Sequence, residues 1–145
     1  MNGIGTSRSG AQLIVNRLEE LFHRPITGIH NRTYGVWFDV LQCFIQRDLL
    51  WPTDDARLGY EILSRAIRNP DLTRIVLICH SQGGIIVGSW IDQLLDDFPH
   101  SQLKGIEIYA FASAANHFSA PGSAVFNRIE HFANERDFVA QIGES

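Results

Sequence analysis

The most informative stretch of this chain reads Ile75-Val76-Leu77-Ile78-Cys79-His80-Ser81-Gln82-Gly83-Gly84-Ile85-Ile86. Its first half is a continuous apolar run rich in β-branched residues, which is typical of a strand covered on both faces in a parallel sheet. Two glycines follow Ser81 closely, and the apolar residues beyond them predict a helix over 84–98. A strand that turns through a serine straight into a helix lifts the serine hydroxyl above the carboxyl edge of the sheet.

Upstream of this stretch, the sequence predicts two helices and one weak strand. Ser9-Gly10-Ala11-Gln12 has the spacing of a capping box, and a helix is expected from there to about Pro25. The run 26–30 is a weak strand candidate. Residues 35–50 are apolar nearly all round, which favours a buried helix over a lid or a membrane-surface helix with one apolar face. The apolar stripe of the first helix consists of Ala11, Ile14, Leu18, Leu21 and Phe22.

Helices and strands are predicted to alternate through the rest of the chain. Thr53, Asp54 and Asp55 favour a helix start, and Asn69-Pro70 ends that helix. Strands are expected at 74–79, 103–112 and 129–132. This order predicts an α/β fold with right-handed crossovers, a three-layer sandwich around a mostly parallel sheet, as a single domain over residues 1–145. The stripe expected to pack inward from the helix after Thr53 is Leu58, Ile62 and Ala66.

Composition and charge exclude several classes of protein. The chain has 12 basic and 16 acidic residues, a net charge of −4, and shows no basic face for nucleic acid. Cys43 and Cys79 lie in apolar runs without the spacing of metal ligands, so we expect buried thiols and no metal site. The glycines near the amino terminus complete neither a dinucleotide-binding motif nor a P-loop, so no cofactor is expected. The first residues do not have the pattern of a secretory signal, and no apolar run approaches the ~20 residues of a membrane span. We therefore expect a cytoplasmic protein.

The segment Cys79-His80-Ser81-Gln82-Gly83-Gly84 resembles the nucleophile elbow of the α/β-hydrolase superfamily, and specifically of its lipase-like serine esterases. In that family His-Ser-x-Gly-Gly is a frequent form of the motif, although Cys79 replaces the first glycine of the usual G-x-S-x-G. Residues 130–138 are similar to the strand and loop that supply the family's acid, and residues 2–6 are similar to its oxyanion loop. The resemblance implies a partial α/β-hydrolase fold, shortened at both ends.

The resemblance also implies a role for each site residue in the hydrolysis of a carboxylic ester. Ser81 would attack the carbonyl carbon with the help of a histidine base. The backbone N–H of Gln82 and the loop at Gly3 and Ile4 would stabilise the developing oxyanion. Asp137 would orient the histidine. The expected substrate is a small-molecule or lipid ester, with no nucleic acid or cofactor involved.

One part of the family pattern is missing. The family's chain order is serine, acid, histidine, yet no histidine follows Asp137. His80 neighbours Ser81 and would point away from it, which leaves His117 as the substitute. We therefore expect weak or no activity, either from a shortened piece of a larger enzyme or from a non-catalytic binding module on a hydrolase scaffold. His23, His100 and His131 are predicted to be structural or solvated.

Three parts of the predicted site also fit a second interpretation. Ser81 is otherwise an ordinary serine in a glycine-rich turn. Asp137 is otherwise a solvated carboxylate, with Glu135 as the acid. Gly3 and Ile4 form either an oxyanion loop or a plain turn.

Overall fold

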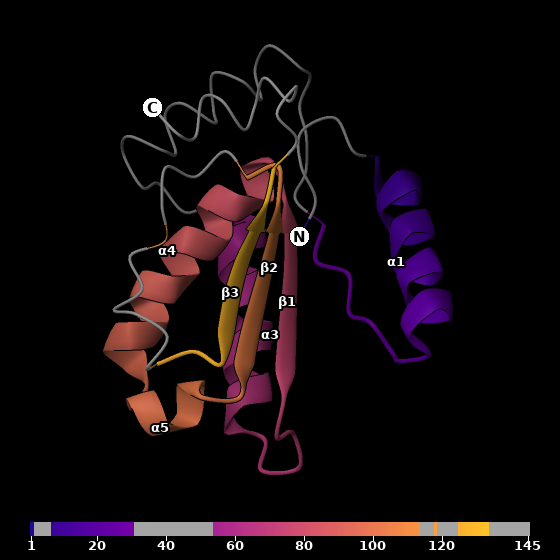
Figure 1. Ribbon diagram of the computed structural model, residues 1–145. Coiled ribbons are helices and arrows are strands. Elements are labelled where there is room, and N and C mark those ends of the chain that lie inside the picture. The colour runs from indigo at the N-terminus through magenta and orange to yellow at the C-terminus, as the bar shows by residue number, and fades with distance from the viewer. Residues whose placement is uncertain (2–6, 31–53, 114–117, 119–124, 134–145) are drawn as a thin grey trace.

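The computed structural model describes residues 1, 7–30, 54–113, 118 and 125–133 (Figure 1). Three strands form one parallel sheet in the order β1-β2-β3. Helix α4 and the short helix α5 connect β1 to β2, as parallel strands require a crossover. The predicted α/β class with a parallel sheet is therefore confirmed. The elements are α1 (Arg8–Phe22), α3 (Asp54–Arg68), β1 (Ile75–His80), α4 (Gln82–Asp97), α5 (His100–Leu103), β2 (Ile106–Phe111) and β3 (Arg128–Phe132).

The core lies between one face of the sheet and helices α3 and α4. The indole Nε1 of Trp90 donates to the carbonyl oxygen of Ala56 at 3.1 Å and so joins α4 to α3. The ring lies over Gly59, where a Cβ would come within 2.6 Å of two ring atoms. Side chains of the core that are fully shielded from solvent include Cys79, Ile91, Leu94, Leu103, Ile108 and Ala110.

The buried face of α3 differs from the predicted stripe of Leu58, Ile62 and Ala66. Leu58 is 56% exposed, because the helix turns a different set of residues towards α4. Small residues let the large ring of Trp90 approach closely, and this fit outweighs the apolar pattern. The buried residues of α3 are Ala56, Gly59, Leu63 and Ser64.

The other face of the sheet is only partly covered. Val76 is 46% exposed, Phe111 41% and Phe132 45%. The rings of Phe111 and Phe132 stack with their centroids 4.8 Å apart. The β-branched run of β1 therefore reflects strand preference, and the predicted burial on both faces is not seen in the described residues.

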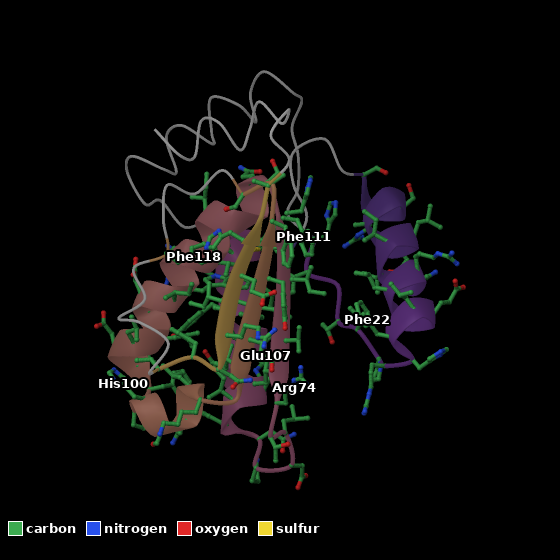
Figure 2. The ribbon with its side chains drawn as sticks, in the orientation of Figure 1. Phe22, Arg74, His100, Glu107, Phe111 and Phe118 are labelled. Atoms are coloured by element: carbon green, nitrogen blue, oxygen red, sulfur yellow. The ribbon has the colours of Figure 1, made fainter. Side chains whose placement is uncertain are left out.

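Glu107 is a buried carboxylate on this same open face. Its carboxylate accepts from Arg74 Nη2 at 2.7 Å, from Asn127 Nδ2 at 2.6 Å and from the Tyr109 hydroxyl at 3.0 Å. Figure 2 shows Arg74 and Glu107 side by side near the amino ends of the strands. These donors, with Arg74 first, lower the pKa of Glu107.

Helix α1 lies on the opposite side of the strands from α4 (Figure 1) and has no buried residue. Its N-cap is Ser7, whose Oγ accepts from the Gly10 N–H at 3.1 Å, so the predicted cap at Ser9 is wrong. Ser9 instead shares a hydrogen bond with the Ser7 hydroxyl at 3.0 Å. The helix ends at Phe22, where His23 takes a left-handed conformation with φ 50°, close to the predicted end.

The weak strand predicted at 26–30 is not formed. The N–H of Ile26 donates to Glu19 Oε1 at 2.8 Å, and Gly28 lies against Val15. The segment is therefore held by α1 and not by a neighbouring strand. The predicted helix at 35–50, with Cys43, and the helix-start residue Thr53 lie outside the described residues.

The second strand begins later than predicted. Residue 103 ends α5, and a turn at Gly105 precedes β2. The carbonyl oxygen of Gly105 accepts from the Ile75 N–H at 3.0 Å, and a Cβ at this glycine would lie 2.5 Å from the Thr73 carbonyl oxygen.

None of the described helices has the length and apolar character needed to cross a bilayer.

Candidate functional site

Ser81 forms the bend between β1 and α4. Its backbone has φ 53° and ψ −123°, a conformation that occurs in type II′ turns and favours glycine. A residue with a Cβ held in such a sparsely populated region is strained by about 1–3 kcal/mol. The chain places its strain at the serine, although Gly83 and Gly84 stand close by in the sequence.

Backbone hydrogen bonds hold this bend on both sides. The N–H of Ser81 donates to the carbonyl oxygen of Phe111 at 3.0 Å, which extends the pairing of β1 with β2 by one residue. The N–H of Gly84 donates to the carbonyl oxygen of Ser81 at 2.9 Å and closes the first turn of α4. The serine is therefore fixed to the sheet and to the helix at once.

The bend lies at the carboxyl edge of the sheet, where ligands bind in open α/β sheets. Ser81 itself is 9% exposed. Gln82, the first residue of α4, is 1% exposed. Its backbone N–H lies at the positive end of the helix macrodipole. A negative charge that develops beside Ser81 would be stabilised by this helix end.

Met1 lies beside the carboxyl end of β1. Its amino group donates to the carbonyl oxygen of Ile78 at 2.9 Å, and its carbonyl oxygen accepts from the His80 N–H at 3.3 Å. Burial lowers the pKa of this amino group. Gly3 and Ile4 follow Met1 closely in the chain but lie outside the described residues.

A second bend follows β2 at the same edge. Ala112 has φ 44°, and its N–H donates to the carbonyl oxygen of Phe132 at 2.8 Å. The next residue, Ser113, lies against Gly84 in the first turn of α4. A Cβ built on Gly84 would lie 2.8 Å from Ser113 Cβ and 3.3 Å from Ser113 Cα, so only glycine fits there without a shift.

Cys79 is a buried thiol, as predicted. Its side chain is fully shielded from solvent, and its Sγ lies 3.8 Å from the carbonyl oxygen of Tyr109. Burial raises the pKa of Cys79 to about 12. A thiol with this pKa is almost wholly protonated at neutral pH and is a poor nucleophile.

No hydrogen bond joins a histidine of the described region to the Ser81 side chain. His80, the neighbour of Ser81 in the chain, is exposed. The ring of His131 lies 4.6 Å from that of Phe118, and desolvation lowers its pKa. His23 and His100 lie at helix ends, as predicted.

Of the predicted site residues, the structure describes Ser81 and Gln82, which are neighbours in the chain at the bend between β1 and α4. The predicted acid Asp137, its alternative Glu135 and the substitute base His117 lie outside the described residues. Sequence reasoning did not single out Ser113. The signal for it was its position just after a predicted parallel strand, because the carboxyl ends of such strands meet at one edge.

Other features of the described region lie away from this edge. A cavity of about 140 Å³ is lined by Ile75 and Ile106, the first residues of β1 and β2, and so lies at the amino edge of the sheet. The described residues contain no cluster of three or more His, Cys, Asp or Glu side chains that could hold a metal ion.

Comparison of the chain with models of protein families, with curated proteins and with solved structures gives no match.

Proposed function

We propose that this protein is a serine hydrolase of the lipase or carboxylesterase kind, with Ser81 as its nucleophile. The observation that supports this most is the bend at Ser81, with φ 53° and ψ −123°, between a parallel strand and a helix. Strained non-glycine residues concentrate at active sites, and a strained strand-to-helix turn is what exposes the nucleophile in this class of enzyme. Glycine would relieve the strain but would remove the hydroxyl.

The chemistry is acyl transfer. The Ser81 hydroxyl adds to the carbonyl carbon of an ester, the alcohol leaves, and water then hydrolyses the acyl-serine. The amide of Gln82, at the amino end of α4, stabilises the oxyanion, and one such donor contributes about 3 kcal/mol. Gly3 and Ile4 supply the second donor. The position of Met1 beside the end of β1 supports this role.

Asp137 orients the histidine base in this proposal, and His117 is the candidate for that base. Without a competent base, the oxyanion donors and substrate binding alone leave a residual acceleration of about 10³ to 10⁴ over water. We therefore propose weak activity on a small-molecule or lipid ester. The proposal includes no cofactor, no nucleic acid and a cytoplasmic location.

We infer a single partial α/β-hydrolase domain built as a three-layer sandwich. The position of α1 across the strands from α3 and α4 supports a third layer (Figure 1). The partly exposed Phe111 and Phe132 on that side are the surface that such a layer covers.

The test is covalent labelling of the purified chain with a fluorophosphonate, read by mass spectrometry of the peptide that contains residue 81. We expect labelling of the wild type and of Ser101→Ala, a control on α5, and none of Ser81→Ala. Equal labelling of Ser81→Ala would overturn the nucleophile assignment.

The burial of Ser81, at 9% exposed, favours a second candidate, a non-catalytic binding module on this scaffold. An unlabelled wild type that folds cooperatively and binds an apolar ester without turnover would support it.

A further inference from the structure

We propose that Ser113 is a positioning residue for this site. Its side chain lies against Gly84 and sets the spacing between the first turn of α4 and the carboxyl end of β2. That spacing holds the amide of Gln82 in place beside Ser81. This inference rests on the proposed function and adds to it a residue outside the elbow motif.

The close approach of the two residues leaves room for a hydrogen atom and no more. A Cβ on Gly84 would lie 2.8 Å from Ser113 Cβ and 3.3 Å from Ser113 Cα, and closer still to Ser113 Oγ. The approach to Ser113 Cβ matters most, because Oγ can rotate away about the Cα–Cβ bond, whereas Cβ is fixed to the backbone and moves only with it. A methyl group at position 84 must therefore displace either Ser113 or the first turn of α4.

The sheet prevents Ser113 from moving freely. The preceding residue, Ala112, turns the chain with φ 44° and is bonded through its N–H to Phe132 of β3 at 2.8 Å. Ser81, one residue after β1, also has a positive φ, and its N–H donates to the carbonyl oxygen of Phe111 of β2 at 3.0 Å. The two bends begin at the same level of the sheet, since His80 pairs with Phe111.

Because Ser113 is held in this way, the helix start, which carries Gln82, must take up part of the displacement. An oxyanion donor works only within about 2.7–3.1 Å of the developing charge. A misplacement of about 1 Å at a catalytic group reduces the rate by about 100-fold. The packing of Gly84 against Ser113 is thus expected to control the rate at Ser81 without touching the substrate.

The experiment is a double-mutant cycle on the full chain. We measure the second-order rate of Ser81 labelling by a fluorophosphonate and the melting temperature of each variant. We expect Gly84→Ala to slow labelling by about 100-fold. In the double variant Gly84→Ala with Ser113→Gly, the labelling rate should rise at least tenfold above that of Gly84→Ala alone. With Ser113→Ala instead, the rate should rise less, because the Cβ of residue 113 remains. Gly88→Ala, one turn along α4, is the control and should leave the rate unchanged, since its Cβ would meet Phe118 at an ordinary 3.5 Å.

The same slow rate for Gly84→Ala with serine or glycine at position 113 would overturn the inference, as would an unchanged rate for Gly84→Ala. If Gly84→Ala does not fold, the labelling rate of the single variant Ser113→Gly tests the inference. Loss of the packing against Gly84 should slow its labelling about tenfold while the protein stays folded. An unchanged rate there overturns the inference.

Failure of the proposed function gives a different result, namely a wild type that is not labelled at Ser81. Amide hydrogen exchange then tests the packing of Gly84 against Ser113 by itself. Exchange at residues 82–85 should be faster in Gly84→Ala and return towards the wild-type rate in Gly84→Ala with Ser113→Gly. Equal exchange in all three proteins overturns the inference.

Discussion

The backbone N–H of Ser81 donates to the carbonyl oxygen of Phe111 at 3.0 Å, so the sheet holds Ser81 at the residue where the chain turns to φ 53°. The bend cannot relax by leaving the strand, because that hydrogen bond and the one from Gly84 would both be lost. Strain at Ser81 is therefore part of the native state and is measurable by substitution.

Ser81→Gly should stabilise the fold while removing the nucleophile. Glycine relieves the strain of about 1–3 kcal/mol at this position. The greater conformational entropy that glycine gives the unfolded chain offsets part of this, so we expect a net stabilisation of about 1 kcal/mol. We expect a rise in Tm of about 2–4 °C, measured by calorimetry. Ser81→Ala is the matched control, since it also lacks the hydroxyl but keeps the Cβ, and its Tm should stay near that of the wild type. Equal Tm values for the two variants would contradict a strained bend.

Gly59→Ala and Gly88→Ala should have opposite effects on stability. A methyl group at Gly59 would lie 2.6 Å from the ring of Trp90, and such overpacking reduces stability by about 1–3 kcal/mol. A methyl group at Gly88 would meet Phe118 at 3.5 Å, so the higher helix propensity of alanine should stabilise the protein by about 1 kcal/mol. Urea unfolding measures both. A stable Gly59→Ala variant would show that Trp90 does not pack as described.

Glu107→Gln should weaken the fold at neutral pH and remove part of its acid sensitivity. The pKa of Glu107 is lowered below its usual 4.5, so its ion pair stabilises the native state fully above that pH and is lost as the pH falls through the folded pKa. We expect a loss of about 1–2 kcal/mol at pH 7 that shrinks below about pH 4.5. Thermal melts between pH 3 and 7 measure it.

Glu130→Gln is the control for that prediction. Glu130 lies on the same face of the sheet and pairs with Arg128 at 3.0 Å, but their side chains are 39% and 56% exposed. An exposed ion pair of this kind contributes less than about 1 kcal/mol. A pH profile for Glu107→Gln that runs parallel to the wild type would exclude Glu107 as the source of acid sensitivity.

Cys79 should be unreactive in the folded protein. With a pKa of about 12, only about one thiol in 10⁴ is ionised at pH 8, and burial blocks access as well. In a Cys43→Ser variant, where Cys79 is the only thiol left, we expect reaction with an aromatic disulfide reagent only after unfolding in guanidinium. Rapid reaction of the native variant would contradict the buried position of β1.

The order of helices and strands follows from local sequence. The β-branched run at β1 and the Asn69-Pro70 stop mark where elements begin and end, and they do so because backbone preference acts over a few residues. The same local signal pointed to Ser81, since a strand, a serine and two glycines in succession permit few conformations. Alternating helices and strands then imply a parallel sheet through the crossover rule.

Tertiary packing decided what local sequence could not. Whether Leu58 or Gly59 faces the core depended on the ring of Trp90, and residues 26–30 stayed out of the sheet because α1 takes up the Ile26 N–H. The strain at Ser81 and the packing of Gly84 against Ser113 likewise exist only once three strands and a helix meet at one edge. A pattern of residue types specifies local conformation, but the packing between segments distant in the chain depends on shapes that only assemble in three dimensions.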